Sequence, residues 1–306
     1  MTLFGLGLAA LGRPGYINLG HGEDVGDASV DGMEGAAFAV LDAAREGGVR
    51  HYDAARSYGR AEAILAGWLR ARAVRPDDVV VSSKWGYRYT AGWRVEAEHH
   101  EIKDLSAAQL RRQWRESSSV LGEHLDVYQI HSATLESGVL DDAEVGTELA
   151  ALRARGVRVG LTVTGADQAA TIERALQVGG FDAVQATWNL HERSAEAALA
   201  RAHDAGLQVY VKEALANGRL TARGAAPELA AVARSRGASE DQIALAAALS
   251  RPWADVVLSG AATVAQLESN LGAAGVAWNE ALEDALGGLA EPADAYWDRR
   301  SRLAWN

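Results

Sequence analysis

Four polar residues stand at or just beyond the ends of apolar segments that are typical of β-strands. Asp53 ends HYD, Tyr58 follows five residues later, Lys84 ends VVVSSK, and His131 ends LDVYQIH. Singly, Asp53 can cap a helix, Lys84 can extend to solvent, and His131 can be a hydrogen-bonded core histidine. Their occurrence at the ends of consecutive strands predicts instead that they share one site.

These residue types together can move a proton while a hydride is transferred. A tyrosine has a pKa of about 10, and a cation within about 4–6 Å lowers it. We expect Lys84 to act on Tyr58 in this way, with Asp53 keeping the ammonium charged and oriented. Tyr58 then donates a proton to a carbonyl oxygen that receives hydride, and accepts it in reverse. His131 is expected to hydrogen-bond the same oxygen and stabilise its negative charge.

The elements that must position these residues alternate regularly along the chain. Strands are predicted at 3–8, 49–53, 78–84, 125–131, 157–163, 181–187, 207–212 and 254–259. Helices are predicted at 33–46, 60–72, 106–122, 143–155, 167–178, 194–205, 227–250 and 263–273. Eight alternations with strands apolar on both faces predict a (β/α)8 TIM barrel of the α/β class, a single domain over residues 1–306. An open doubly wound sheet is the alternative.

Long segments follow two of the strands, at 86–104 after the third strand and 213–226 after the seventh. In a barrel both lie on the C-terminal face, where active sites are built. The C-terminal tail, 290–306, is expected to pack at this rim or to cap the barrel. Aromatic residues predicted to line the substrate pocket are Trp85, Tyr87, Trp93 and Trp188. They suit an aromatic ring or the apolar face of a sugar, although half of them can be packing residues.

A glycine-rich motif at the N-terminus is similar to a dinucleotide-binding fingerprint. Gly5, Gly7 and Ala10 fit G-x-G-x-x-A, and Asp24 lies nineteen residues after Gly5. Such a motif must open a helix, whereas Gly-Arg-Pro-Gly at 12–15 ends one. We therefore interpret the segment as a glycine-rich first strand.

The composition excludes several classes of protein. The chain has 306 residues, 30 basic against 41 acidic, a net charge of -11 and no cysteine. An acidic chain without a basic stripe is not expected to bind nucleic acid. No apolar stretch has the roughly 18 residues of a membrane span, and the start is a poor signal peptide. The absence of cysteine fits a reducing compartment, so a cytoplasmic location is expected.

Three segments are similar to motifs of the aldo-keto reductase family. They are GVRHYDAARSYGRAE at 48–62, SSKWG around Lys84, and LDVYQIHS around His131. The resemblance runs from about residue 3 to residue 275. It implies that Asp53, Tyr58, Lys84 and His131 form a catalytic tetrad. It also implies an NAD(P)H-dependent enzyme that reduces a small carbonyl or sugar substrate, or works in reverse as an alcohol or aldose dehydrogenase.

The resemblance further implies which residues hold the coenzyme. Thr162 and Gln185 would hold the nicotinamide carboxamide, and Lys212 would pack near the ring, beside Asp53. The pyrophosphate and adenosine positions would be Leu215, Asn217, Gly260, Gln266 and Asn270.

Two positions depart from the family pattern. Val163 stands where an asparagine is usual, and Ala262 where many relatives carry an arginine for the 2′-phosphate. A phosphate dianion normally binds arginine or lysine. NADP(H) is therefore expected over NAD(H) with only a modest preference. Arg219 or Arg223 can compensate for the arginine that is missing at Ala262.

Other functions stay open at this point. The chain can be a non-catalytic nicotinamide-binding regulatory subunit. It can also be an aldolase-like barrel in which Lys84 or Lys212 forms a Schiff base with the substrate. Metal hydrolysis is not expected, because His99-His100 and His191-Glu192 do not have a recognised ligand spacing. The sequence does not indicate the oligomeric state.

Overall fold

The computed structural model describes residues 3–306, which form a closed parallel barrel. Its strands are β1 (Leu3–Gly7), β2 (His51–Asp53), β3 (Val80–Trp85), β6 (Leu125–Ala133), β7 (Arg158–Val163), β8 (Ala183–Thr187), β9 (Gln208–Lys212) and β10 (Val256–Ser259). The order around the barrel is β1-β10-β9-β8-β7-β6-β3-β2, so β1 pairs with both β2 and β10. The predicted (β/α)8 barrel is confirmed, and the open sheet is excluded.

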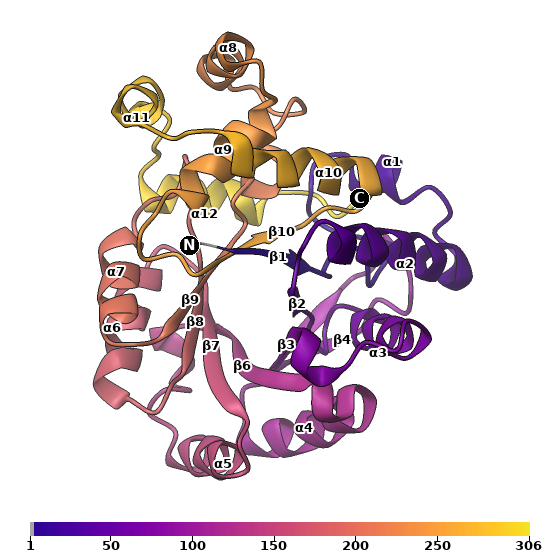
Figure 1. Cartoon of the computed structure of the whole chain (residues 1–306). Coiled ribbons are helices and arrows are strands. Elements are labelled where there is room, and N and C mark those ends of the chain that lie inside the picture. Colours follow the sequence, from indigo (N-terminus) through magenta and orange to yellow (C-terminus); the bar gives the residue numbers. More distant parts are fainter. Residues whose placement is uncertain (1–2) are drawn as a thin grey trace.

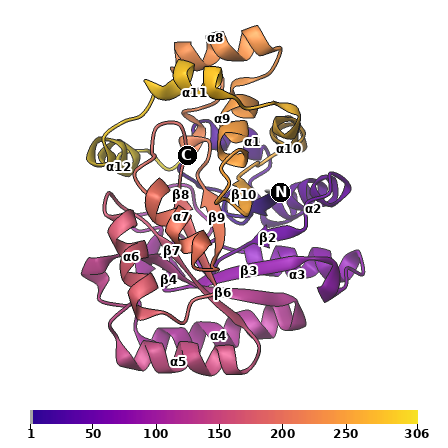
Figure 2. The ribbon, with the colours of Figure 1, turned by 60° about the vertical axis from the view of Figure 1, so that its left-hand side comes forward.

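Helices surround the strands and bury one face of each against them (Figures 1 and 2). The principal ones are α2 (Val30–Glu46), α3 (Ala61–Ala71), α4 (Ala107–Leu121), α5 (Ala143–Ala154), α6 (Gln168–Val178), α7 (Glu196–Asp204), α8 (Pro227–Arg236), α9 (Glu240–Leu249) and α10 (Val264–Leu271). Several begin at a side-chain cap: Ser106 accepts from the Gln109 amide, and Asp142 from the Val145 amide.

One long predicted helix, 227–250, is two helices in the structure. Gly237 ends α8 in a left-handed conformation at φ 62°, and Ser239 begins α9 with a capping box. Glycine adopts that backbone at no steric cost, and the polar residues around it, Arg234–Arg236 before it and Ser239–Gln242 after it, are a helix end and a helix start. Helices α8 and α11 (Glu280–Gly287) lie outermost, beyond α9 (Figures 1 and 2).

The segments that cover the C-terminal face are more ordered than the sequence suggested. The loop after β3 contains an antiparallel hairpin of β4 (Tyr87–Tyr89) and β5 (Glu101–Lys103). The short helix α1 (His21–Val25) follows β1, and α12 (Ala293–Ser301) lies in the tail. Tyr16 and Asn306 exchange two backbone hydrogen bonds of 3.1 Å, which join the tail to the loop after β1.

The N-terminal glycine motif does not open a helix. Strand β1 ends at Gly7, and turns follow it up to α1. The interpretation as a glycine-rich strand is confirmed. Among residues 3–306, no helix is both long and apolar enough to cross a membrane.

Candidate active site

A cavity of about 700 Å³ opens on the C-terminal face of the barrel. It is lined by Asp53, the last residue of β2, by Tyr58 in the loop that follows, and by His131 near the end of β6. It extends past the loop after β9 to Gly260, at the start of the loop before α10, and to Gln266. This volume is typical of ligand pockets.

Asp53 and Lys84 form a buried ion pair. Their side chains are 4% and 1% exposed, respectively. Ser82 donates to Asp53 Oδ1 at 2.6 Å, and Lys84 Nζ also donates to the Ala54 carbonyl at 3.0 Å. Because both groups make further hydrogen bonds, the geometry of the ion pair is fixed.

Tyr58 lies between this ion pair and His131. Its hydroxyl is 3.5 Å from His131 Nε2, and Lys84 Nζ is 4.8 Å from the centre of its ring. The segment approaches Gly12 so closely that a Cβ there would lie 2.1 Å from the Tyr58 carbonyl oxygen. Only glycine at position 12 leaves room for the Tyr58 backbone at this distance, and Gly12 thus helps to fix the position of the tyrosine.

The protonation of Tyr58 and His131 is dominated by burial. Burial raises the pKa of Tyr58 well above 10, Asp53 raises it further, and Arg13 opposes both. Burial and Asp53 therefore outweigh the lowering expected from a neighbouring cation. Burial, assisted by the charge of Lys84, lowers the pKa of His131 well below 6.5. At neutral pH the site thus presents a protonated phenol and a neutral imidazole, which can both donate a hydrogen bond.

The residues expected to hold the coenzyme line this same cavity. They are Asp53, Thr162, Gln185, Lys212, Leu215, Asn217, Gly260, Gln266 and Asn270. Two of them carry buried polar atoms without a partner among residues 3–306, namely Gln185 Nε2 and Asn217 Oδ1. Such atoms are costly unless a ligand satisfies them. Gln185 can donate to a carboxamide oxygen, so the cavity fits a nicotinamide dinucleotide. Val163 is buried and does not line it.

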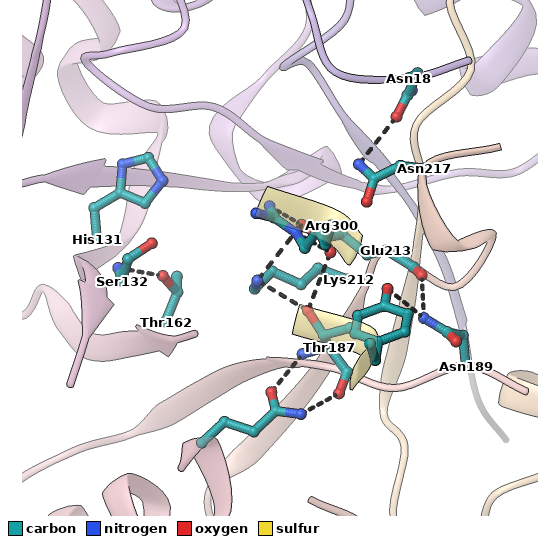
Figure 3. Close-up of polar contacts among 12 residues, drawn as sticks. Asn18, His131, Ser132, Thr162, Thr187, Asn189, Lys212, Glu213, Asn217 and Arg300 are labelled. Carbon is teal, nitrogen blue, oxygen red and sulfur yellow. Dashed lines mark hydrogen bonds and ion pairs between the residues drawn. The ribbon is translucent and has the colours of Figure 1, made fainter. Parts of the chain in front are cut away.

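A network of charged residues that the sequence did not reveal lies beside Lys212 (Figure 3). Arg300 of α12 donates to Glu213 Oε2 at 2.8 Å, and Lys212 donates to Thr187 Oγ1 at 3.0 Å. Burial lowers the pKa of Lys212 to about 8, against the opposing charge of Glu213. Burial raises the pKa of Glu213, but Arg300 and Lys212 outweigh it and bring that pKa to about 2.

The aromatic lining differs from the expected one. Tyr87 lines the cavity, and its ring centre is 4.9 Å from that of His131. Trp85, Trp93 and Trp188 do not line it, which corrects the sequence expectation.

The period of a β-strand explains two of these errors. Neighbouring side chains point to opposite faces of a strand. Lys84 and Thr187 face their polar partners at the barrel mouth, so the adjacent Trp85 and Trp188 are buried among the helices instead. Trp93 donates to the Ala28 carbonyl at 2.9 Å, away from the cavity.

Three residues from the ends of the chain take the place of these tryptophans. Tyr16 and Trp305 line the cavity, and the Arg13 guanidinium lies 5.2 Å from the Tyr16 ring and 4.7 Å from the Trp305 ring. Arg13 also donates to the Ser57 carbonyl at 3.0 Å and pairs with Glu101. The aromatic tail at 290–306 was the one sequence signal that pointed to this contact.

Comparisons with known proteins agree with this geometry. A model of the Aldo/keto reductase family matches residues 33–281. Aldo-keto reductase str7 of Strobilurus tenacellus is 23% identical over 332 aligned residues, covering 97% of this chain and 90% of that protein.

Solved structures share the fold at low identity. The holo form of an aldo-keto reductase from Bacillus halodurans superposes with a TM-score of 0.72 at 18% identity, covering 95% of this chain and 92% of its own. A protein from Pseudomonas aeruginosa, described as an aldo-keto reductase, gives 0.64 at 23% identity, covering 89% and 88%. At such identities these structures establish the fold alone, whereas the family model matches most of the chain.

Proposed function

This chain belongs to the aldo/keto reductase family and is an NAD(P)H-dependent oxidoreductase, and on that premise we propose that it reduces aldehydes or ketones to alcohols with Tyr58 as the proton donor. The observation that carries the proposal is the position of the Tyr58 hydroxyl, 3.5 Å from His131 Nε2 and above the buried pair of Lys84 and Asp53.

The chemistry divides between the coenzyme and the protein. When bound, the nicotinamide supplies the hydride in reduction and accepts it in oxidation. Tyr58 hydrogen-bonds the carbonyl oxygen and gives it a proton, which its raised pKa makes available throughout the neutral range. His131, neutral because of its burial, donates a second hydrogen bond to the same oxygen. Lys84, held by Asp53, stabilises the phenolate that remains.

The substrate is proposed to be a small carbonyl compound or a sugar. Tyr87 packs against His131, and Tyr16 and Trp305 line the same cavity, together with the charged Arg13 and Glu101. Aromatic faces with hydrogen-bonding groups between them suit a hydroxylated carbon chain. The same site can oxidise an alcohol or an aldose in reverse.

We also propose a cytoplasmic location, with which the absence of cysteine is consistent.

The coenzyme would be held along the rest of the cavity. We expect Gln185 and Thr162 to bind the carboxamide, Asn217 the pyrophosphate, and Gln266 and Asn270 the adenosine, because all five line the cavity. Thr162 Oγ1 accepts from the Ser132 amide at 2.7 Å, so its hydroxyl hydrogen stays available to a ligand. The resemblance favours NADP(H) as the coenzyme, a preference that the next subsection revises.

One observation keeps a second candidate function under test. The pKa of Lys212 is about 8 and its side chain lines the cavity, so a part of it is an unprotonated amine at neutral pH. Such an amine can attack a carbonyl to form a Schiff base. Borohydride added with a carbonyl substrate would then attach that substrate covalently to Lys212. We expect no such adduct, because Lys212 donates to Thr187 and its charge lies 3.9 Å from Glu213.

The proposed reaction is tested with a panel of aldehydes, ketones and aldoses. Consumption of NADH and NADPH is followed by absorbance, with and without each carbonyl compound. We expect oxidation of the coenzyme that requires the carbonyl compound. A chain that binds coenzyme tightly but oxidises it with no member of the panel would instead support the regulatory-subunit alternative.

A further inference from the structure

A carboxylate, Asp24 of α1, lies in the part of the cavity that is formed by α10. Its side chain is only 13% exposed and lines the cavity. Gln266 donates to Asp24 Oδ2 at 2.8 Å, while the Gln266 oxygen accepts from the Ala262 amide at 2.9 Å. Asp24 is therefore fixed to the loop that precedes α10.

Asp24 also holds the one basic side chain at this end of the cavity. Arg223, in the loop after β9, donates to the two carboxylate oxygens of Asp24 at 2.6 and 2.7 Å, and to the Leu19 carbonyl at 3.1 Å. Burial raises the pKa of Asp24, but the hydrogen bonds from Arg223 and Gln266 outweigh it and leave that pKa lowered. Asp24 is thus a carboxylate at neutral pH, and both terminal nitrogens of Arg223 are bound to it.

Along the cavity, every arginine and lysine among the described residues 3–306 is paired with a carboxylate. Four basic side chains line it within residues 3–306, and each faces a carboxylate: Arg13 with Glu101, Lys212 and Arg300 with Glu213, and Arg223 with Asp24. A second carboxylate, Asp241, lines the same end as Asp24 and accepts from Ser269 at 2.7 Å. Gly260 and Ala262 carry no charge.

The direction in which a dinucleotide lies follows from the chemistry at the other end. Hydride transfer requires the nicotinamide beside Tyr58 and His131, so the adenosine must extend toward α10. The ribose hydroxyls of NADH can donate to a carboxylate, and this interaction is how acidic residues select NADH in other folds. A 2′-phosphate at the same place would meet a carboxylate instead of a free guanidinium.

We propose that Asp24 makes this enzyme selective for NADH over NADPH, by accepting hydrogen bonds from the adenosine ribose and by keeping Arg223 away from a 2′-phosphate. The proposal rests on the proposed placement of the coenzyme in this cavity, and it reverses the preference for NADP(H) that the family resemblance implied.

The test is equilibrium binding of NADH and of NADPH in the absence of any carbonyl substrate, at one ionic strength. Titration calorimetry or coenzyme fluorescence gives both Kd values. We expect the wild type to bind NADH at least about tenfold more tightly, since like charges brought together cost a kilocalorie or more. Asp24→Asn should lower this ratio by about tenfold or more, because it removes one negative charge and releases Arg223.

Two further variants identify the cause. Glu23→Gln removes the same charge from the neighbouring residue, whose side chain is 84% exposed and 3.9 Å from Arg223. It should leave the ratio unchanged. Arg223→Gln should abolish the gain in NADPH affinity when it is added to Asp24→Asn.

Two results would overturn the proposal. One is a wild type that binds NADPH as tightly as NADH, a result that needs no variant to fold. The other is an Asp24→Asn variant, folded by its unchanged circular dichroism, with the wild-type ratio. The binding test contains no carbonyl compound, so a protein that reduces no carbonyl compound can still show the expected selectivity for NADH. Failure of this proposal is therefore distinguishable from failure of the proposed reaction.

Discussion

Tyr58 is the residue at which burial and charge act against each other. Burial and Asp53 raise its pKa, while Arg13, whose guanidinium lies 5.2 Å from the tyrosine ring, lowers it. The sequence-based expectation considered the neighbouring cation and not the burial of the hydroxyl, which dominates the net pKa. A raised pKa suits a proton donor, because the phenol stays protonated at every pH at which the protein is expected to work.

At this scale the sequence predicted best those residues that stand at strand ends. Asp53 and His131 line the cavity at the barrel mouth, and Lys84 lies buried beneath them, paired with Asp53. The contact between Glu213 and Arg300 was not predicted, because neither segment carries a sequence signal for it. Their contact depends on the path of the tail, which is a tertiary feature.

The tail is the element whose docking most affects the site. Helix α12 carries Arg300, which binds Glu213, and Tyr296, whose hydroxyl accepts from Asn189 at 3.0 Å. Burial lowers the pKa of Arg300, but Glu213 outweighs it and leaves that pKa raised. The pair of Arg300 and Glu213 therefore stays ionised and anchors α12 to the loop after β9.

We expect Arg300→Ala to lower the free energy of unfolding by about 2–3 kcal/mol, because it leaves Glu213 buried with Lys212 as its remaining charged partner. The tail should also become more sensitive to limited proteolysis. Arg299→Ala is the matched control, since that side chain is 61% exposed and lies 3.9 Å from Glu291. Denaturant unfolding measures both variants, and equal stabilities would show that α12 is not held by the Glu213 pair.

Element boundaries were predicted well where the chain carries its own start and stop signals. Ser106 and Asp142 cap helices at the expected places, and Gly156 follows the end of α5. The break at Gly237 was missed although the chain carries both signals there, because the helix prediction over 227–250 did not use the glycine stop or the Ser239–Gln242 capping box. The hairpin of β4 and β5 was missed because its exposed strands have no apolar pattern.

The barrel as a whole was predictable because its pattern repeats eight times and each repeat is individually weak but consistent. The aromatic lining of the cavity was predicted only at Tyr87, because Tyr16 and Trp305 come from segments near the two ends of the chain whose meeting the sequence does not indicate. The solved structures with the same fold are only 18–23% identical to this chain, so the fold is kept while most residues differ.

The stability of the whole molecule is expected to fall in mild acid because of histidines buried in it. His51, 6% exposed at the opening of β2, packs edge-on against Tyr210. Burial, with help from Arg158, lowers its pKa from 6.5 to about 4. Between these two pH values the unfolded chain binds a proton that the folded chain does not, so stability is present above 6.5 and is lost as the pH falls toward 4.

We expect the free energy of unfolding to decrease by about 1–2 kcal/mol between pH 7 and pH 5 from His51 alone. His51→Asn should remove that part of the slope, whatever its effect on stability at pH 7. His99→Asn, which changes a side chain that is 68% exposed, should keep the wild-type slope. Denaturant titrations at both pH values measure it, and identical slopes for the two variants would refute the assignment to His51.

The central claim, that Tyr58 gives the proton to the substrate, is tested most directly by single-turnover kinetics. Enzyme loaded with coenzyme is mixed rapidly with a carbonyl compound that the wild type reduces, and the loss of coenzyme absorbance is followed. Tyr52→Phe is the control, because Tyr52 is buried outside the cavity and its hydroxyl donates only to the Val49 carbonyl, at 3.2 Å.

Tyr58→Phe should bind coenzyme with nearly the wild-type Kd and transfer hydride at least about a hundredfold more slowly, whereas Tyr52→Phe should stay within about threefold of the wild type. A Tyr58→Phe variant that reduces the carbonyl compound at the wild-type rate would contradict the proposed role of Tyr58.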